Sequence, residues 1–193
     1  MPFLILRLQF FIILETWFKL AEVCMKIRYG TIDDAAMLAE LGAKTFYDTY
    51  ASDNTAENIS AYIGKSFSTE IQSSELADTN IIFLIAELEN RPVGYAKIKL
   101  DSRDESIRGT KQVEIERIYS LEEYIGKGIG KALMQAAIDD AKQRGCNSIW
   151  LGVWEQNSRA INFYKKWGFH EVGSHIFTVG NDPQRDLILE LQI

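Results

Sequence analysis

Apolar residues along the chain follow two different periods. Runs rich in β-branched residues, in which apolar and polar positions alternate, predict strands, while apolar residues at helical spacing predict helices. Strands are expected at 26–29, 81–87, 93–100, 113–120, 148–154, 169–179 and 186–192. Helices are expected at 31–47, 55–63, 68–76, 128–144 and 157–167.

The order of these elements predicts the class of fold. In the second half of the chain strands alternate with helices, which is typical of parallel strands joined by a crossover helix. In contrast, 81–87 and 93–100 flank the turn Glu89-Asn90-Arg91-Pro92 and are expected to pair as an antiparallel hairpin. A second turn, at 180–183, joins the last two strands. We therefore predict an α/β fold with one mixed sheet and helices on both faces.

Residues 1–24 differ from the rest of the chain. They begin with the almost wholly apolar run MPFLILRLQFFIIL, and Glu15 ends that run before the ~20 apolar residues that a transmembrane helix needs. A signal peptide would begin with a positively charged segment and end at a small-residue cleavage site, and the sequence shows neither clearly. We interpret 1–24 as an extension from an upstream start and 25–193 as the domain. The alternative is a weak anchor at a membrane surface, without stable insertion.

Composition narrows the classes of function. The chain has 193 residues, of which 47% are hydrophobic and 25% charged, as expected for one globular domain. Its net charge is −6, so nucleic-acid partners are disfavoured and cationic amines are easier partners. The two cysteines, Cys24 and Cys146, lack metal-ligand spacing, and the two histidines are too few for a His-rich site. We predict a cytoplasmic protein without a metal ion.

A glycine-rich segment, GKGIGK at 126–131, follows a predicted strand and opens a predicted helix. Glycines let the backbone approach an anion, and the N–H groups at the helix N-terminus point toward it. Lys127 and Lys131 add positive charge. Neither the Walker spacing nor the dinucleotide-binding fingerprint is present. The segment therefore predicts a phosphate- or pyrophosphate-binding turn, and coenzyme A carries a pyrophosphate.

A second cluster has the pattern N-x-x-A-x-x-F-Y-x-K-x-G-F at 157–169. Together with GKGIGKALM, it resembles the GCN5-related N-acetyltransferase (GNAT) superfamily, over nearly all of 25–193. More narrowly, TFYDTY, EIERIY, IWLGVWE and AINFYKKWGF resemble the PaiA-type spermine/spermidine acetyltransferases of bacteria. The resemblance implies the GNAT fold, a mixed and mostly antiparallel sheet with two splayed central parallel strands.

The resemblance also implies acetyl-CoA as co-substrate, direct attack of an amine on the thioester, and no metal. Tyr164 would protonate the leaving thiolate. The implied cofactor-binding residues are Ile118, Tyr119 and Ser120 for the pantetheine arm, Gly126, Lys127, Gly128, Ile129, Gly130 and Lys131 for the pyrophosphate, Asn157 near the pantetheine, and Lys166 near the phosphate end. Ile125 departs from the family, which usually has Arg or Gln there, so weaker cofactor binding is expected.

The acceptor site is read from the residues themselves. Glu116 is the candidate proton acceptor for the amine, and Glu114 lies on the same strand face. Tyr47, Asp48 and Tyr50 form a candidate cation-binding rim at the end of the first helix. The alternatives are structural, namely a solvated strand face or an ion pair with Arg117, a helix end with core aromatics, and a core position for Tyr164.

These residues together predict an N-acetyltransferase for a small-molecule primary amine, most simply the polyamines spermidine or spermine. The alternatives are acetylation of a protein or peptide amine, and a CoA-binding regulatory module without turnover. The sequence leaves the oligomeric state open, and a homodimer is compatible with it.

Overall fold

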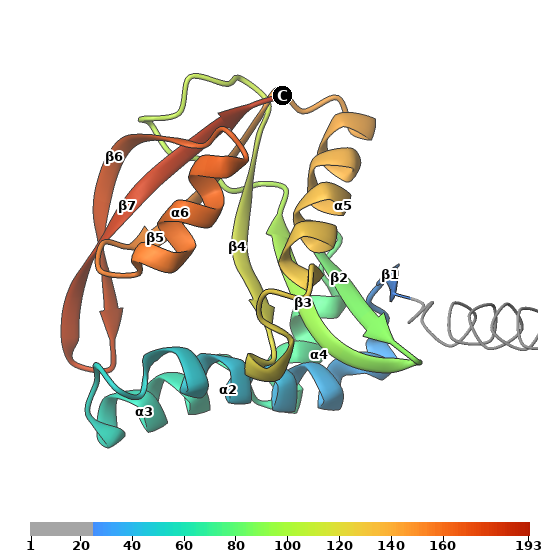
Figure 1. Cartoon of the computed structure of the whole chain (residues 1–193), viewed down its shortest axis with the longest axis vertical. Coiled ribbons are helices and arrows are strands. Elements are labelled where there is room, and N and C mark those ends of the chain that lie inside the picture. The colour runs from blue at the N-terminus through green and yellow to red at the C-terminus, as the bar shows by residue number, and fades with distance from the viewer. Residues whose placement is uncertain (1–24) are drawn as a thin grey trace, which may run out of the picture.

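The structure is a computed structural model that describes residues 25–193 (Figure 1). The interpretation of 1–24 as an apolar extension concerns residues outside the described part. Within that part, no helix is both long and apolar enough to cross a membrane.

One seven-stranded sheet organises the described chain, with the strand order β1-β2-β3-β4-β5-β7-β6. All neighbouring pairs are antiparallel except β4 and β5, which are parallel. The strands are β1 (Met25–Tyr29), β2 (Ile81–Leu88), β3 (Arg91–Lys99), β4 (Gln112–Ser120), β5 (Ser148–Trp154), β6 (His170–Val179) and β7 (Asp182–Gln192). The sequence prediction of a mixed, mostly antiparallel sheet is therefore confirmed.

Polar side chains fix where several helices begin. Thr55 accepts a hydrogen bond from the Asn58 N–H, and Ser68 accepts one from the Ile71 N–H, so both act as N-caps. The helices are α2 (Ala35–Tyr50), α3 (Ala56–Ser66), α4 (Thr69–Ala77), α5 (Ile129–Gln143) and α6 (Ser158–Lys166). Short 3-10 turns at Ile32–Asp34 and Glu122–Tyr124 precede α2 and α5, and the sequence pattern did not predict them.

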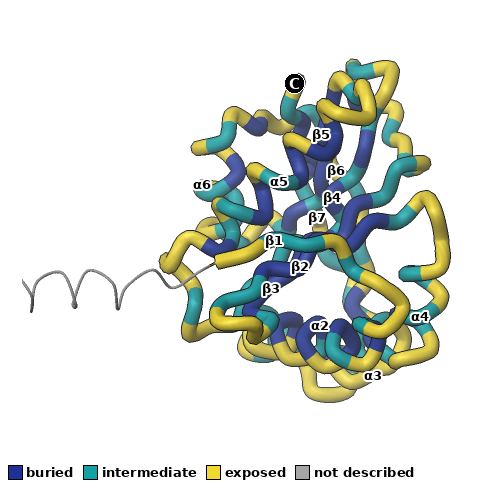
Figure 2. Tube along the Cα trace, turned by 90° about the vertical axis from the view of Figure 1, so that its right-hand side faces the viewer, coloured by how far each residue is buried: buried dark blue, intermediate teal, exposed yellow. Residues whose placement is uncertain are grey.

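The helices cover both faces of the sheet, as predicted. The larger core lies under α5 and α6, where Leu133, Met134 and Tyr164 pack with Ile149 and Leu151 of β5. On the opposite face α2 packs on β2 and β3, and α3 packs toward β6. Figure 2 shows the buried residues concentrated in the central strands and on the inner sides of the helices.

Both hairpin turns are shorter than predicted. Glu89 and Asn90 have φ of 50° and 62°, so two residues close the β2–β3 turn and Pro92 belongs to β3. Val179 pairs with Asp182, so only Gly180 and Asn181 lie between β6 and β7. Strand pairing thus continues through residues whose types favour turns.

The parallel pair at the centre of the sheet is brief. It is formed by three residue pairs, from Gln112–Ser148 to Glu114–Trp150. Beyond them β4 remains paired with β3 and β5 with β7, while the two central strands diverge. This divergence positions the site described next.

Candidate active site

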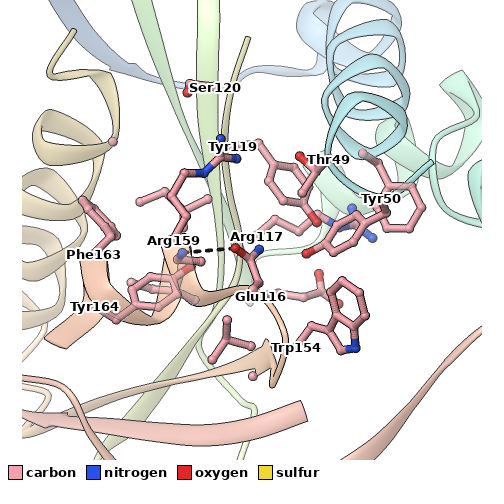
Figure 3. Close-up of a pocket in the computed structure, with 18 of the residues that line it drawn as sticks. Thr49, Tyr50, Glu116, Arg117, Tyr119, Ser120, Trp154, Arg159, Phe163 and Tyr164 are labelled. Carbon is pink, nitrogen blue, oxygen red and sulfur yellow. Dashed lines mark hydrogen bonds between the residues drawn. The ribbon is translucent and has the colours of Figure 1, made fainter. Parts of the chain in front are cut away.

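A cavity of about 520 Å³ opens where β4 and β5 diverge. One end is formed by the C-terminal half of β4, the turn before α5 and the first residues of α5 and α6. The other end is formed by α2, α3 and the strands β5, β6 and β7. We call these the turn end and the acceptor end. Figure 3 shows side chains from both ends pointing into the space between them.

The turn end has the backbone geometry of an anion site. Gly126 and Gly128 have φ of +81° and +90°, and an added Cβ at either would meet nothing within 4 Å. The backbone is therefore open to the cavity at both residues. Because the first N–H groups of a helix have no partner within it, those at the start of α5 are free to bind an anion there.

Not every residue of the glycine-rich segment faces this cavity in the same way. Gly126, Gly128, Gly130 and Lys131 line it. The Ile129 side chain is 2% exposed and belongs to the core, so only its backbone can contribute. The Lys127 Nζ lies over the ring of Tyr124, 5.2 Å from its centroid.

The end of β4 runs along the same space, and Ile118, Tyr119 and Ser120 all line the cavity. Across the opening, Asn157 accepts a hydrogen bond from the Ala160 N–H at 3.1 Å and caps α6 while also lining the cavity. The N-cap interpretation of Asn157 is therefore confirmed, and its hydrogen bond near the pantetheine stays a prediction. A ligand between β4 and α6 would meet backbone groups on one side and an amide side chain on the other.

Tyr164 lies in the turn of α6 that faces the cavity and is 8% exposed. Burial raises the pKa of its hydroxyl above the ordinary value, so the group keeps its proton. Its ring packs edge-on against Phe163 and Phe169. Tyr164 is thus a core residue that also lines the cavity, and its role as proton donor stays a prediction. Lys166 is exposed near the end of α6 and is not among the cavity residues of the described chain.

Glu116 sits at a β-bulge, because Arg117 and Ile115 pair with consecutive residues of β3 and Glu116 is left between them. Its Oε2 lies 2.5 Å from the Lys97 Nζ, and its Oε1 lies 3.5 Å from the Lys99 Nζ. Burial raises the pKa of this carboxyl, but Arg117, Lys97 and Lys99 outweigh burial and the net pKa is lowered. The ion pair expected with Arg117 is therefore not found among the described residues: Glu116 pairs with Lys97 and Lys99, and Arg117 lies nearest to Glu75.

Of the three residues predicted to form a cation-binding rim, only Tyr50 lines the cavity. Tyr50 lines the cavity, and burial together with Asp186 raises its pKa to about 12, although contacts with Tyr119 and Asn157 oppose the shift. Tyr47 is 56% exposed, and Asp48 accepts a hydrogen bond from Lys44 on the helix surface. Neither these two nor Glu114 is among the cavity-lining residues of 25–193. The helical period explains this, since neighbouring residues of α2 face different directions.

Several cavity residues were not predicted from the sequence. Tyr62 of α3, Phe177 of β6 and Asp186 of β7 line the acceptor end, and Arg117 and Arg159 also border the cavity. Figure 3 shows Arg159 reaching from α6 toward the end of β4. Asp186 and Arg159 could have been singled out as charged residues beside apolar or motif positions, but only tertiary pairing shows that they face one cavity.

A splayed parallel pair with an open helix N-terminus at one side suits a ligand that combines a phosphate group with an extended arm. The chain belongs to the acetyltransferase (GNAT) family, whose profile matches residues 43–169. It is therefore an N-acetyltransferase that uses acetyl-CoA, as the sequence predicted.

Individual relatives agree with this assignment. The chain is 30% identical over 166 residues to an uncharacterized N-acetyltransferase from the pepI 3' region of Lactobacillus delbrueckii subsp. lactis, covering 86% of this chain and 96% of the relative. It is 30% identical over 149 residues to a spermidine N(1)-acetyltransferase of Thermoplasma acidophilum, covering 75% and 88%. The crystal structure of the PaiA N-acetyltransferase of Thermoplasma acidophilum in complex with coenzyme A is similar, with a TM-score of 0.72, 27% identity and coverage of 88% and 99%.

Proposed function

We propose that the protein transfers the acetyl group of acetyl-CoA to a primary amine of a polyamine such as spermidine or spermine. The observation that carries the proposal is the composition of the acceptor end. The aromatic rings of Tyr50, Tyr62 and Trp154 and the carboxylate of Asp186 border the cavity there, and the Glu116 carboxylate borders the same cavity from β4. Aromatic faces and carboxylates together attract alkylammonium groups. A relative named as a spermidine acetyltransferase supports the same substrate class.

The turn end fits the coenzyme. Backbone N–H groups within Gly126–Lys131, apart from that of Lys127, which donates to the Tyr124 carbonyl, would bind its diphosphate. Lys131 and Arg159 would add charge, and the end of β4 would pair with the pantetheine arm. When bound, acetyl-CoA supplies the activated acetyl group. The β-bulge at Glu116 interrupts the pairing of β4 with β3, and backbone N–H groups that follow it would stabilise the negative charge on the carbonyl oxygen during attack.

Two side chains would move protons. Tyr164, which keeps its proton because it is buried, would donate it to the leaving thiolate. The acceptor ammonium must lose a proton before the nitrogen can attack, because its pKa is ~10. Glu116, alone or through a water molecule, is the base that the sequence suggested. Its ion pairs lower its pKa, so it can act only as a weak base.

A second acceptor class is favoured by one observation. Arg117 lines the cavity, and its Nη1 is buried without a hydrogen-bond partner within 25–193. This group would suit a carbonyl or carboxylate oxygen next to the reacting amine, as in a peptide or an amino acid.

The test is acetyl transfer, followed by release of coenzyme A, with spermidine, spermine, amino acids and peptide N-termini at equal salt concentration. A higher kcat/KM for the polyamines supports the proposal. A higher value for peptides or amino acids would assign the protein to the second class. Tight acetyl-CoA binding without transfer to any amine would identify a regulatory module and contradict both.

A further inference from the structure

We propose that Asp186, which lies across the β6–β7 pairing from His175, binds the acceptor ammonium and takes its proton, in place of Glu116. This inference rests on the proposed transfer to an amine and specifies which group of the cavity receives the amine. Asp186 lies on β7, directly opposite Trp154 of β5 and His175 of β6. It lines the acceptor end of the cavity, whereas His175 is not among the cavity-lining residues of the described chain.

The side chains of Asp186 and His175 converge over Gly152. A Cβ at Gly152 would lie 3.2 Å from the His175 Nε2 and 3.5 Å from the Asp186 Oδ2. Because Gly152 has no side chain, β5 leaves room for the side chains of His175 and Asp186, and the Asp186 carboxylate is accessible from the cavity. Since the same glycine also lines the cavity, an amine bound there is next to Asp186.

The charges of the surrounding groups distinguish Asp186 from Glu116. Three cations (Lys97, Lys99 and Arg117) lie among three carboxylates (Glu75, Glu114 and Glu116), at distances from 2.5 to 3.9 Å. This network is balanced in charge without a ligand. In contrast, no Lys, Arg or His nitrogen of the described residues lies within 4.0 Å of the Asp186 carboxylate. Asp186 is the carboxylate left for an incoming cation.

Burial gives Asp186 the basicity that a proton acceptor needs. Burial raises its pKa to about 6, and His175 opposes this shift. The other titratable group that faces it is Tyr50 of α2, whereas its β5 neighbours Gly152 and Trp154 are uncharged. A group with this pKa is ionised at neutral pH and still accepts a proton more readily than an ordinary carboxylate.

The proton transfers balance. An N–H bond of the ammonium breaks as an O–H bond forms on Asp186, which leaves a neutral amine. The nitrogen lone pair then forms the amide bond while the carbon–sulfur bond breaks. Tyr164 gives its proton to the thiolate, and the second proton of the nitrogen replaces it. Asp186 finally releases its proton to solvent, so the net reaction yields one amide, one thiol and one proton.

The experiment compares pH profiles of kcat/KM for spermidine in the full-length wild type and in Asp186→Asn. In the wild type, kcat/KM should rise through the Asp186 pKa of about 6 and then level off, because the enzyme binds the ammonium form. In Asp186→Asn, kcat/KM at neutral pH should fall by about 100-fold or more, which is typical of removing a general base. In this variant, log kcat/KM should also rise with pH at unit slope up to the amine pKa of ~10, because only the neutral amine can then react.

His175→Gln gives an independent readout. Because His175 lowers the pKa of Asp186, its removal should move the acidic limb to higher pH without abolishing transfer. Glu155→Gln is the matched control, since Glu155 is an exposed carboxylate beside β5 that pairs with Arg185. Acetyl-CoA affinity, measured by calorimetry, should be the same in all three variants.

The outcomes separate this inference from the proposed function. A wild type that acetylates no amine would contradict the proposed function itself. A wild type that is active, with Asp186→Asn retaining its rate and its levelled profile, would overturn the role of Asp186 alone. If the acidic limb of the kcat/KM profile lies at the same pH in His175→Gln as in the wild type, His175 has no influence on Asp186. This result can be obtained even if Asp186→Asn fails to fold.

Discussion

Tyr164 illustrates how a single side chain acquires a chemical role from its surroundings. It packs between Phe163 and Phe169 and is almost fully buried, and this burial raises the pKa of its hydroxyl, so the hydroxyl is protonated at neutral pH. The same burial that makes it a core residue therefore suits it to the proposed role of proton donor.

Tyr164→Phe should lower kcat by about 100-fold, because the thiolate would leave without a proton. Acetyl-CoA affinity should stay within about twofold of the wild-type value, because the hydroxyl is proposed to act on the leaving group and not in ground-state binding. Single-turnover kinetics and calorimetry measure the two quantities. Tyr29→Phe, which removes a hydroxyl that donates to Asp140 outside the cavity, is the control and should change neither. An unchanged single-turnover rate in Tyr164→Phe would exclude the hydroxyl as the acid.

The two cationic side chains Arg159 and Lys166 should contribute differently to acetyl-CoA binding. Arg159 lines the cavity with Lys131, whereas Lys166 is exposed beyond its lining. We expect Arg159→Ala to weaken acetyl-CoA binding by about tenfold, as for a lost charge-assisted hydrogen bond, and Lys166→Ala to change it by less than about twofold. Titration calorimetry at one ionic strength compares them. A larger loss in Lys166→Ala would place the phosphate end of the coenzyme along the outer side of α6.

The candidate site could be predicted from the sequence only where a motif carried it. The glycine turn, Asn157 and Tyr164 lie within 126–164, and neighbouring positions identify one another there. Asp186 and Tyr62 come from β7 and α3, and nothing near them in the chain indicates a shared cavity. Ion pairs such as Lys97–Glu116 likewise depend on strand register, which the sequence does not state.

At the scale of elements, local patterns were sufficient for nearly all helices and strands. The bounds predicted for β5 agree with the structure, and the helices expected to start at Thr55, Ser68 and Asn157 are α3, α4 and α6, which these three residues cap. The 3-10 turns and the two short hairpin turns were missed, because pairing across the sheet decides how far a strand extends. The order in which β7 lies between β5 and β6 also required the structure.

The turn between β4 and α5 is an element whose function is directly testable. Gly128→Glu should abolish acetyl-CoA binding, because the new carboxylate would occupy the open space where an anion is expected. Calorimetric titration measures the loss. Gly145→Glu is the matched control, since Gly145 also has a positive φ, of +71°, but follows the other end of α5. It should bind acetyl-CoA normally despite the same backbone strain. Equal affinity of wild type and Gly128→Glu would contradict the assignment of this turn.

At the scale of the whole molecule, charge should govern the approach of the acceptor. The net charge of −6 and the carboxylates of the acceptor end attract polycations over distances that salt screens, since the Debye length is ~10 Å at 0.1 M. The KM for spermine should therefore rise by roughly an order of magnitude from low to high ionic strength. A monoamine of similar length is the control and should show a smaller rise. Equal salt dependence of the two amines would show that the net charge has no part in substrate capture.

The divergence of β4 and β5 links the stability of the folded chain, and its resistance to proteolysis, to coenzyme binding. After three residue pairs, two strands in the middle of the sheet present facing edges without a shared ladder of hydrogen bonds. We expect bound coenzyme to fill that interval and to bind only the folded chain. It would then shift the folding equilibrium by mass action, adding about 2.7 kcal/mol when its free concentration is about 100 times the Kd. Amide protons along both edges should then exchange more slowly with solvent, and proteases should meet the opened chain less often. The amount of this enzyme that survives therefore depends on how much acetyl-CoA is available to it.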